Sequence, residues 1–151
     1  MAEALAGVKI SLLNSKEVAL RVVSALLRFF SYLYHTLFAL LMVVLGALLT
    51  VAGAGPSLHL EMLPWTGPTA IYVLLFGGIF GLLTVVLALR GSVRPLFFLW
   101  AVAVTVYLVK GYFLGGYRFT PDEFSRVVYL TIGSIVALLG AFLQMFRPSK
   151  R

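Results

Sequence analysis

The chain has 151 residues, of which 62% are hydrophobic and 11% are charged, and its formal net charge is +7. This composition excludes an ordinary soluble domain and an intrinsically disordered chain. The absence of cysteine excludes disulfides, thiolate metal sites, iron–sulfur clusters and thiol redox chemistry. At this length a single domain is expected.

A polar stripe marks the segment before the first long apolar run. Asn14 and Glu17 have the spacing of the N-cap and N3 residues of a capping box, so we expect a helix to begin there. Glu17, Arg21, Ser24 and Arg28 then recur on one side of an otherwise apolar helix, with Glu17 and Arg21 spaced for an ion pair. We interpret the segment as a short amphipathic helix in the cytoplasmic membrane interface; the alternative is a cytoplasmic extension of the first span.

Four long apolar runs follow, and each has about the ~20 residues that a helix needs to cross ~30 Å of hydrocarbon. The runs cover residues 29–54, 69–89, 96–114 and 127–146. We therefore predict an all-α membrane protein of four antiparallel transmembrane helices. Its expected divisions are a cytoplasmic segment at 1–28, a transmembrane domain at 29–147 and a short basic tail at 148–151.

Two helix starts are marked by proline. Pro68 suits the first position of the second span, where the missing N–H costs nothing. The fourth helix is expected to begin after Thr120, because Thr120 and Glu123 flank a proline with the spacing of a capping box. Asp122 is spaced to pair with Arg126 one turn later.

The loop charges give the spans a direction. Nine basic residues lie before the first run, between the second and third, and after the fourth, against only two acidic ones. The opposite side, with Lys110 near the outer end of the third span included, has three basic and three acidic residues. The excess of Lys and Arg on one side places both termini in the cytoplasm. We expect the bacterial cytoplasmic membrane as the location.

Small residues recur at helical spacing in two of the runs, and in lipid such residues let helices approach closely. The first interpretation is packing within the chain's own bundle, and the alternative is contact with another subunit. The residues concerned are Gly77, Gly81, Thr84 and Ala88 in the second run and Gly133, Ala137 and Gly140 in the fourth.

Lys110 is the one charged residue inside a predicted span, near the outer end of the third. An ionisable residue at such a position suggests function, although a lysine stem also lets the ammonium reach the interface. We interpret Lys110 first as reaching the interface or as part of a structural ion pair. The alternative is a basic pocket of Lys110, Arg118 and Arg126 that binds an anionic lipid headgroup or ligand.

The two histidines are predicted to lie on opposite sides of the membrane. His35 is near the cytoplasmic start of the first span and His59 is in the outer connection, so by helix rise they are about 30 Å apart. One chain cannot clamp a haem between them. We interpret His35 as an interfacial histidine, with ligation of a haem or pigment by His35 or His59 alone as a minor alternative. No intrinsic cofactor or metal is expected.

Catalytic patterns are missing from the sequence. No predicted span holds Asp or Glu, and no Ser-His-Asp set, HExxH or glycine-rich phosphate loop occurs. We therefore expect no enzyme activity. The leading hypothesis is an accessory or scaffolding subunit of a larger integral membrane complex. The alternatives are a small carrier or lipid- or anion-binding protein that uses the outer basic residues, and a transient assembly factor. Expected partners are membrane subunits and phospholipid, not nucleic acid.

Overall fold

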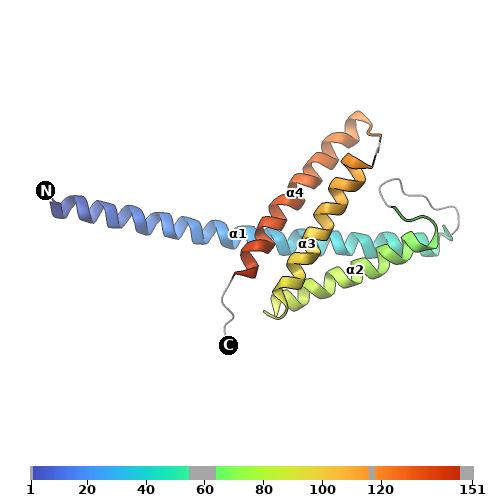
Figure 1. Ribbon diagram of the computed structural model, residues 1–151, viewed down its shortest axis with the longest axis horizontal. Coiled ribbons are helices and arrows are strands. Elements are labelled where there is room, and N and C mark those ends of the chain that lie inside the picture. The colour runs from blue at the N-terminus through green and yellow to red at the C-terminus, as the bar shows by residue number, and fades with distance from the viewer. Residues whose placement is uncertain (1, 55–63, 116–117, 147–151) are drawn as a thin grey trace.

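Four helices form the part of the chain that the computed structural model describes, which is residues 2–54, 64–115 and 118–146, without the side chains of residues 2–14 and 121 (Figure 1). They are α1 (Ala2–Val51), α2 (Pro68–Leu89), α3 (Arg94–Leu108) and α4 (Pro121–Met145), and a π-helix, η1 (Val109–Leu114), continues α3. These described ranges contain no strand. Four helical stretches are long and apolar enough to cross a membrane, which confirms the predicted fold class at that level.

Helix α1 is a single helix of 50 residues. At 1.5 Å per residue it is about 75 Å long, roughly two and a half times the thickness of a hydrocarbon core. Figure 1 shows its N-terminal part extending well beyond the other helices. Residue 14 lies inside this helix, so the predicted start at Asn14 and the separate short interfacial helix are both wrong. The physical reason is the composition, since no Gly or Pro occurs between residues 8 and 45 to interrupt the helix.

The helices pack in a ring, in which α1 lies against α2 and α4, and α3 lies against α2 and α4. Figure 1 shows the α3–α4 pair inclined steeply to α1, with α2 closer to the direction of α1. The α3–α4 pair is antiparallel, because Thr105 approaches Ser134 while Phe98 contacts Phe142. The α2–α3 turn is tight, with Val93 in the left-handed region at φ 51° just before α3.

One tyrosine joins all four helices at one end of the bundle. The phenol of Tyr32 in α1 reaches the carbonyl oxygen of Ala88 at 3.4 Å and accepts a 2.6 Å hydrogen bond from the amide of Gln144. Its ring stacks on Phe97 with centroids 5.1 Å apart. The end of α2, the start of α3 and the end of α4 therefore meet α1 at the same level, beside a core of small and aromatic side chains.

Two glycines allow the closest approaches between helices. A Cβ added at Gly140 would collide with the carbonyl oxygen of Leu27 in α1. A Cβ at Gly78 would lie 2.7 Å from the carbonyl oxygen of Ala39. In contrast, the nearest atom to a Cβ at Gly77 is the flexible end of a methionine, 3.1 Å away. The backbone of α1 thus rests on Gly140 and Gly78.

The helix starts predicted at proline are confirmed. Pro68 is the first residue of α2. Thr120 and Glu123 form a complete capping box, in which the Glu123 carboxylate accepts a 3.1 Å hydrogen bond from the Thr120 N–H. The expected ion pair of Asp122 with Arg126 is not formed by these two exposed, described side chains. The capping box alone is sufficient to set the start of α4.

Candidate functional site

The α1–α2 pair and the α3–α4 pair cross near one end of the bundle and diverge toward the other end. On α1 the crossing with α4 runs from Leu27, beside Gly140, to Tyr34. The Tyr34 phenol donates a 2.9 Å hydrogen bond to the carbonyl oxygen of Leu130. Farther along, α1 follows α2, where Gly46 packs against Leu75.

A cavity of about 310 Å³ lies where the pairs diverge. All four helices contribute to its wall, together with Trp65 from the α1–α2 connection. The wall consists of Phe38, Leu41, Met42, Leu45, Trp65, Val73, Leu74, Gly77, Trp100, Ala103, Val104, Tyr107, Leu108, Tyr112 and Leu130. None of these side chains is charged, and most of them are apolar or aromatic. The site is therefore suited to an apolar occupant.

The cavity is continuous with the outer surface of the bundle. Leu41, Leu45 and Tyr107 line it and are also 50%, 42% and 44% exposed. Trp65 extends across toward α3, with its ring centroid 5.7 Å from that of Tyr107. In a membrane, the molecules next to this opening are lipids.

The π-helix η1 continues α3 and contributes to the same side of the cavity wall. Both Leu108, at the end of α3, and Tyr112, inside η1, line the cavity. Short π-helical segments are uncommon and occur frequently at functional sites. Lys110 is two residues from both of these lining positions, so it lies on the other side of the helix, where it is exposed. No pattern in the sequence predicted η1.

The three basic residues of the predicted pocket lie near the connection of η1 to α4. Lys110, Arg118 and Arg126 are all exposed. Arg126 is one helical turn before Leu130. Both residues belong to the face of α4 that, farther toward its C-terminus, packs against α1. The residues that follow Arg126 on this face of α4 are Leu130, Gly133, Ala137, Gly140 and Gln144. Of the three basic residues, Arg126 is therefore the one placed on the cavity side by helical register.

The small residues singled out in the sequence lie within this chain's own packing. Gly81, Thr84, Ala88, Ala137 and Gly140 are buried. Gly133 faces the ring of Tyr34, and Gly77 lines the cavity. At Gly81 the ring of Trp100 packs so closely that an added Cβ would lie 2.5 Å from it. This arrangement is the one that the first interpretation of these stripes expected.

His35 lies in the bundle core, and its level near the membrane interface stays a prediction. It is fully buried, with the rings of Tyr34 and Phe97 edge-on to it at 5.5 and 5.3 Å. Its Nδ1 lies 2.8 Å from the carbonyl oxygen of Ser31, which can only accept, so Nδ1 carries the proton. The lone pair of Nε2 then has no hydrogen-bond partner among the described residues. The i, i+4 spacing of Ser31 and His35 was the available sequence signal for a common buried face.

Several Thr and Ser hydroxyl groups in the helices are satisfied within their own helix. Hydroxyl groups donate to backbone carbonyl oxygens three or four residues earlier, at 2.7–2.9 Å. The residues concerned are Thr36, Thr50, Thr84, Thr105, Thr131 and Ser134. Such bonds let polar side chains lie inside an apolar bundle. Among the described residues no group of three potential metal ligands occurs, and His59 lies outside them.

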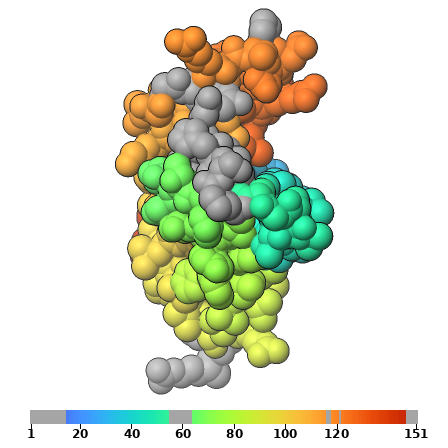
Figure 2. Space-filling view, turned by 90° about the vertical axis from the view of Figure 1, so that its right-hand side faces the viewer, coloured from blue at the N-terminus to red at the C-terminus, as the bar shows by residue number. Residues whose placement is uncertain are grey.

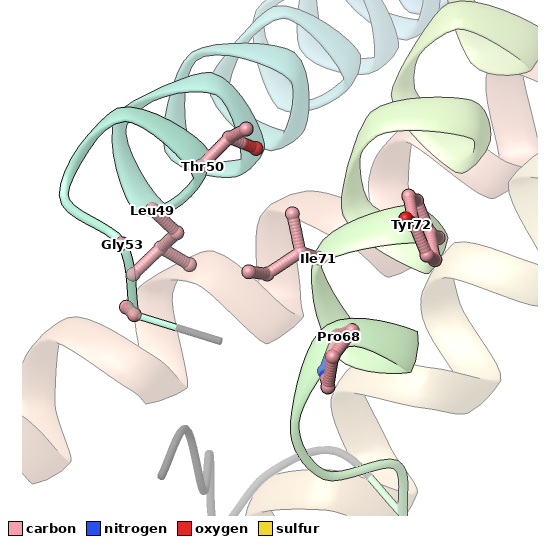
Figure 3. A pocket seen from close by; sticks show the side chains of 7 residues that line it. Leu49, Thr50, Gly53, Pro68, Ile71 and Tyr72 are labelled. Atoms are coloured by element: carbon pink, nitrogen blue, oxygen red, sulfur yellow. The ribbon is translucent and has the colours of Figure 1, made fainter. Parts of the chain in front are cut away.

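A second cavity, of about 220 Å³, lies between the outer ends of α1 and α2. Figure 3 shows Leu49 of α1 facing Ile71 of α2 across it. The Thr50 hydroxyl already donates a 2.7 Å bond to the carbonyl oxygen of Gly46. Figure 2, which looks onto this end, shows α1 and α2 side by side, with the orange end of the α3–α4 pair above them. This cavity lacks a charged side chain as well.

Comparison with known proteins gives no assignment. No protein-family model, curated protein or solved structure matches the chain. Its sequence and geometry are what bear on its function.

Proposed function

We propose that the chain is a non-catalytic accessory or scaffolding subunit of a larger integral membrane complex, and that the N-terminal part of α1 docks it there. The observation that carries this proposal is an apolar helix surface without cover from the rest of the chain. Between residues 15 and 26 most side chains are exposed. The apolar ones that are more than half exposed are Val18, Leu20, Val22, Val23 and Leu26.

The predicted polar stripe gives this segment two distinct sides. Arg21 lies 3.9 Å from the carboxylate of Glu17, and Arg28 donates a 3.3 Å hydrogen bond to the hydroxyl of Ser24. Val18, Val22 and Leu26 follow one another on the opposite side of the helix. An amphipathic helix gains most of its stability by burying its apolar side against another element. A neighbouring subunit would supply such an element.

Measurement of the assembly state tests this docking role. The wild-type chain should migrate in a larger assembly after gentle solubilisation of native membranes. A triple variant, Val18→Gln, Val22→Gln and Leu26→Gln, should migrate at its own mass, while the matched pair Lys16→Gln and Arg21→Gln should stay assembled. A wild-type chain that runs as a lone monomer contradicts the subunit role, and an assembled triple variant contradicts the docking element.

We also propose that the end of the bundle marked by Tyr32 faces the cytoplasm of a bacterial cell, with both termini on that side. The support is the basic charge of Arg28, Arg90 and Arg94 at this end. Because the chain has no cysteine, single cysteines at Ser92 and Thr66 report the two sides without background. In intact cells an impermeant maleimide should label Thr66→Cys, and Ser92→Cys only after lysis. The reverse pattern contradicts this orientation.

A lipid- or anion-binding carrier is the second candidate, and the cavity favours it. If Lys110 carries this role, Lys110→Met should abolish flux of an anionic substrate in liposomes, whereas an unchanged flux would exclude Lys110. A transient assembly factor is distinguished from a stable subunit by its recovery with immature but not mature complexes.

A further inference from the structure

The size and wall of the larger cavity favour part of one hydrocarbon chain. Its volume of about 310 Å³ is about twice that of an engineered apolar cavity of roughly 150 Å³ that binds one benzene. The half-exposed Leu41, Leu45 and Tyr107 give access from the side that faces lipid. A lipid chain can therefore enter from the bilayer without crossing water.

Arg126 supplies a positive charge one helical turn from Leu130, the α4 residue of the cavity wall. The face of α4 that packs on α1 extends as far as Leu130, and Arg126 is the next residue on that face. Because α4 is inclined to α1 and the two helices diverge beyond Tyr34 (Figure 1), the next position of this face is exposed. A guanidinium group can donate up to five hydrogen bonds and suits phosphate geometry.

Arg126 forms no ion pair with the described carboxylates next to it, although it interacts electrostatically with Glu123 at longer range. Glu123 accepts the Thr120 N–H in the capping box, and the described side chains of Asp122 and Arg126 form no ion pair. Trp65 and Tyr112 line the same cavity, and such aromatic residues are enriched at the headgroup level of membranes. An apolar cavity next to one basic residue is complementary to an anionic amphiphile.

We infer that the cavity between the helix pairs holds one acyl chain of an anionic phospholipid, with the lipid phosphate bound by Arg126. This site does not depend on a partner subunit, so its test is independent of the docking role of α1. The occupant is a lipid that exchanges with the bilayer and is not consumed.

The two tryptophans of the chain make this binding measurable. Trp65 and Trp100 are the only tryptophans in the sequence, and both line the cavity. The protein is placed in phosphatidylcholine nanodiscs with increasing fractions of phosphatidylglycerol brominated in its acyl chains, and tryptophan fluorescence is recorded. Brominated phosphatidylcholine is titrated in parallel. The wild-type chain should reach half of its maximal quenching at about a fivefold lower fraction of phosphatidylglycerol, as expected for one basic residue.

Matched variants separate the site from general contact with lipid. Arg126→Gln should remove the preference for phosphatidylglycerol, and Lys110→Gln, on the other side of α3, should retain it. Ala103→Phe and the milder Ala103→Leu fill the cavity and should lower the maximal quenching. Val106→Phe, at a position that is 55% exposed and outside the cavity wall, should not lower it.

Three results would overturn the inference. One is equal quenching by the two brominated lipids in the wild-type chain. Another is an equal loss of preference in the Arg126→Gln and Lys110→Gln variants. The third is unchanged maximal quenching in both Ala103 variants. Native mass spectrometry gives a second reading, since wild-type protein should retain one phosphatidylglycerol that the Ala103→Leu variant loses.

Discussion

The side-chain amide of Gln144 in α4 donates a 2.6 Å hydrogen bond to the phenol oxygen of Tyr32 in α1. The same tyrosine stacks on Phe97 and reaches the backbone of Ala88, so this bond belongs to the one place where all four helices meet. Gln144 is buried, and hydrocarbon offers no water to replace a lost partner.

A double-mutant cycle should detect this bond. Tyr32→Phe and Gln144→Leu should each lower the free energy of unfolding, with a coupling of about 1 kcal/mol, within the range measured for hydrogen bonds between membrane helices. Reversible unfolding in micelles or bicelles provides the measurement. Tyr129→Phe, at a position that is 75% exposed, is the control and should leave stability unchanged. A coupling near zero would mean that the bond contributes nothing to stability.

The crossing of α1 and α4 should depend on Gly140 more than on Gly133. Gly140→Ala places a methyl group against the Leu27 carbonyl oxygen and forces the helices apart, which should cost about 1–3 kcal/mol. Gly133→Ala meets only the edge of the Tyr34 ring at 3.1 Å, and better helix propensity offsets the contact. The two free energies of unfolding are compared under identical conditions, and equal values would contradict this packing.

Within the Gly77-Gly78 pair, the second glycine should be the sensitive one. Gly78→Ala brings its methyl group 2.7 Å from the Ala39 carbonyl oxygen, whereas Gly77→Ala meets the movable end of Met42. We expect Gly78→Ala to destabilise the α1–α2 contact by about 1–3 kcal/mol and Gly77→Ala to stay within about 1 kcal/mol of the wild type. Thermal unfolding in detergent ranks the two variants. A larger loss of stability in Gly77→Ala than in Gly78→Ala would mean that Gly77, and not Gly78, contacts the backbone of α1.

Replacement of His35 by leucine should be nearly neutral. The change removes a buried Nε2 lone pair that has no described partner, together with one hydrogen bond to the Ser31 carbonyl oxygen. Because the loss and the gain oppose each other, the free energy of unfolding should change by less than about 1 kcal/mol. Chemical denaturation checks this. A loss above about 3 kcal/mol would show that Nε2 has a binding partner in the native protein.

The sequence alone determined the features that depend on neighbours within a few residues. The four apolar helices, the start of α2 at Pro68 and the capping box of Thr120 and Glu123 follow from local composition and spacing. The Glu17–Arg21 pair is of the same kind. Each involves residues three or four positions apart or the length of an apolar run, so no knowledge of another helix is needed.

Only the tertiary structure decided which faces meet. The sequence pattern selected Gly77 for the small-residue stripe of α2, whereas Gly78 makes the closest approach to the backbone of α1. The burial of His35 and the cavity above Leu130 depend on where the two helix pairs cross and how far they diverge. Interhelical register and inclination are set by side-chain packing between segments far apart in the chain, and local sequence patterns do not contain that information.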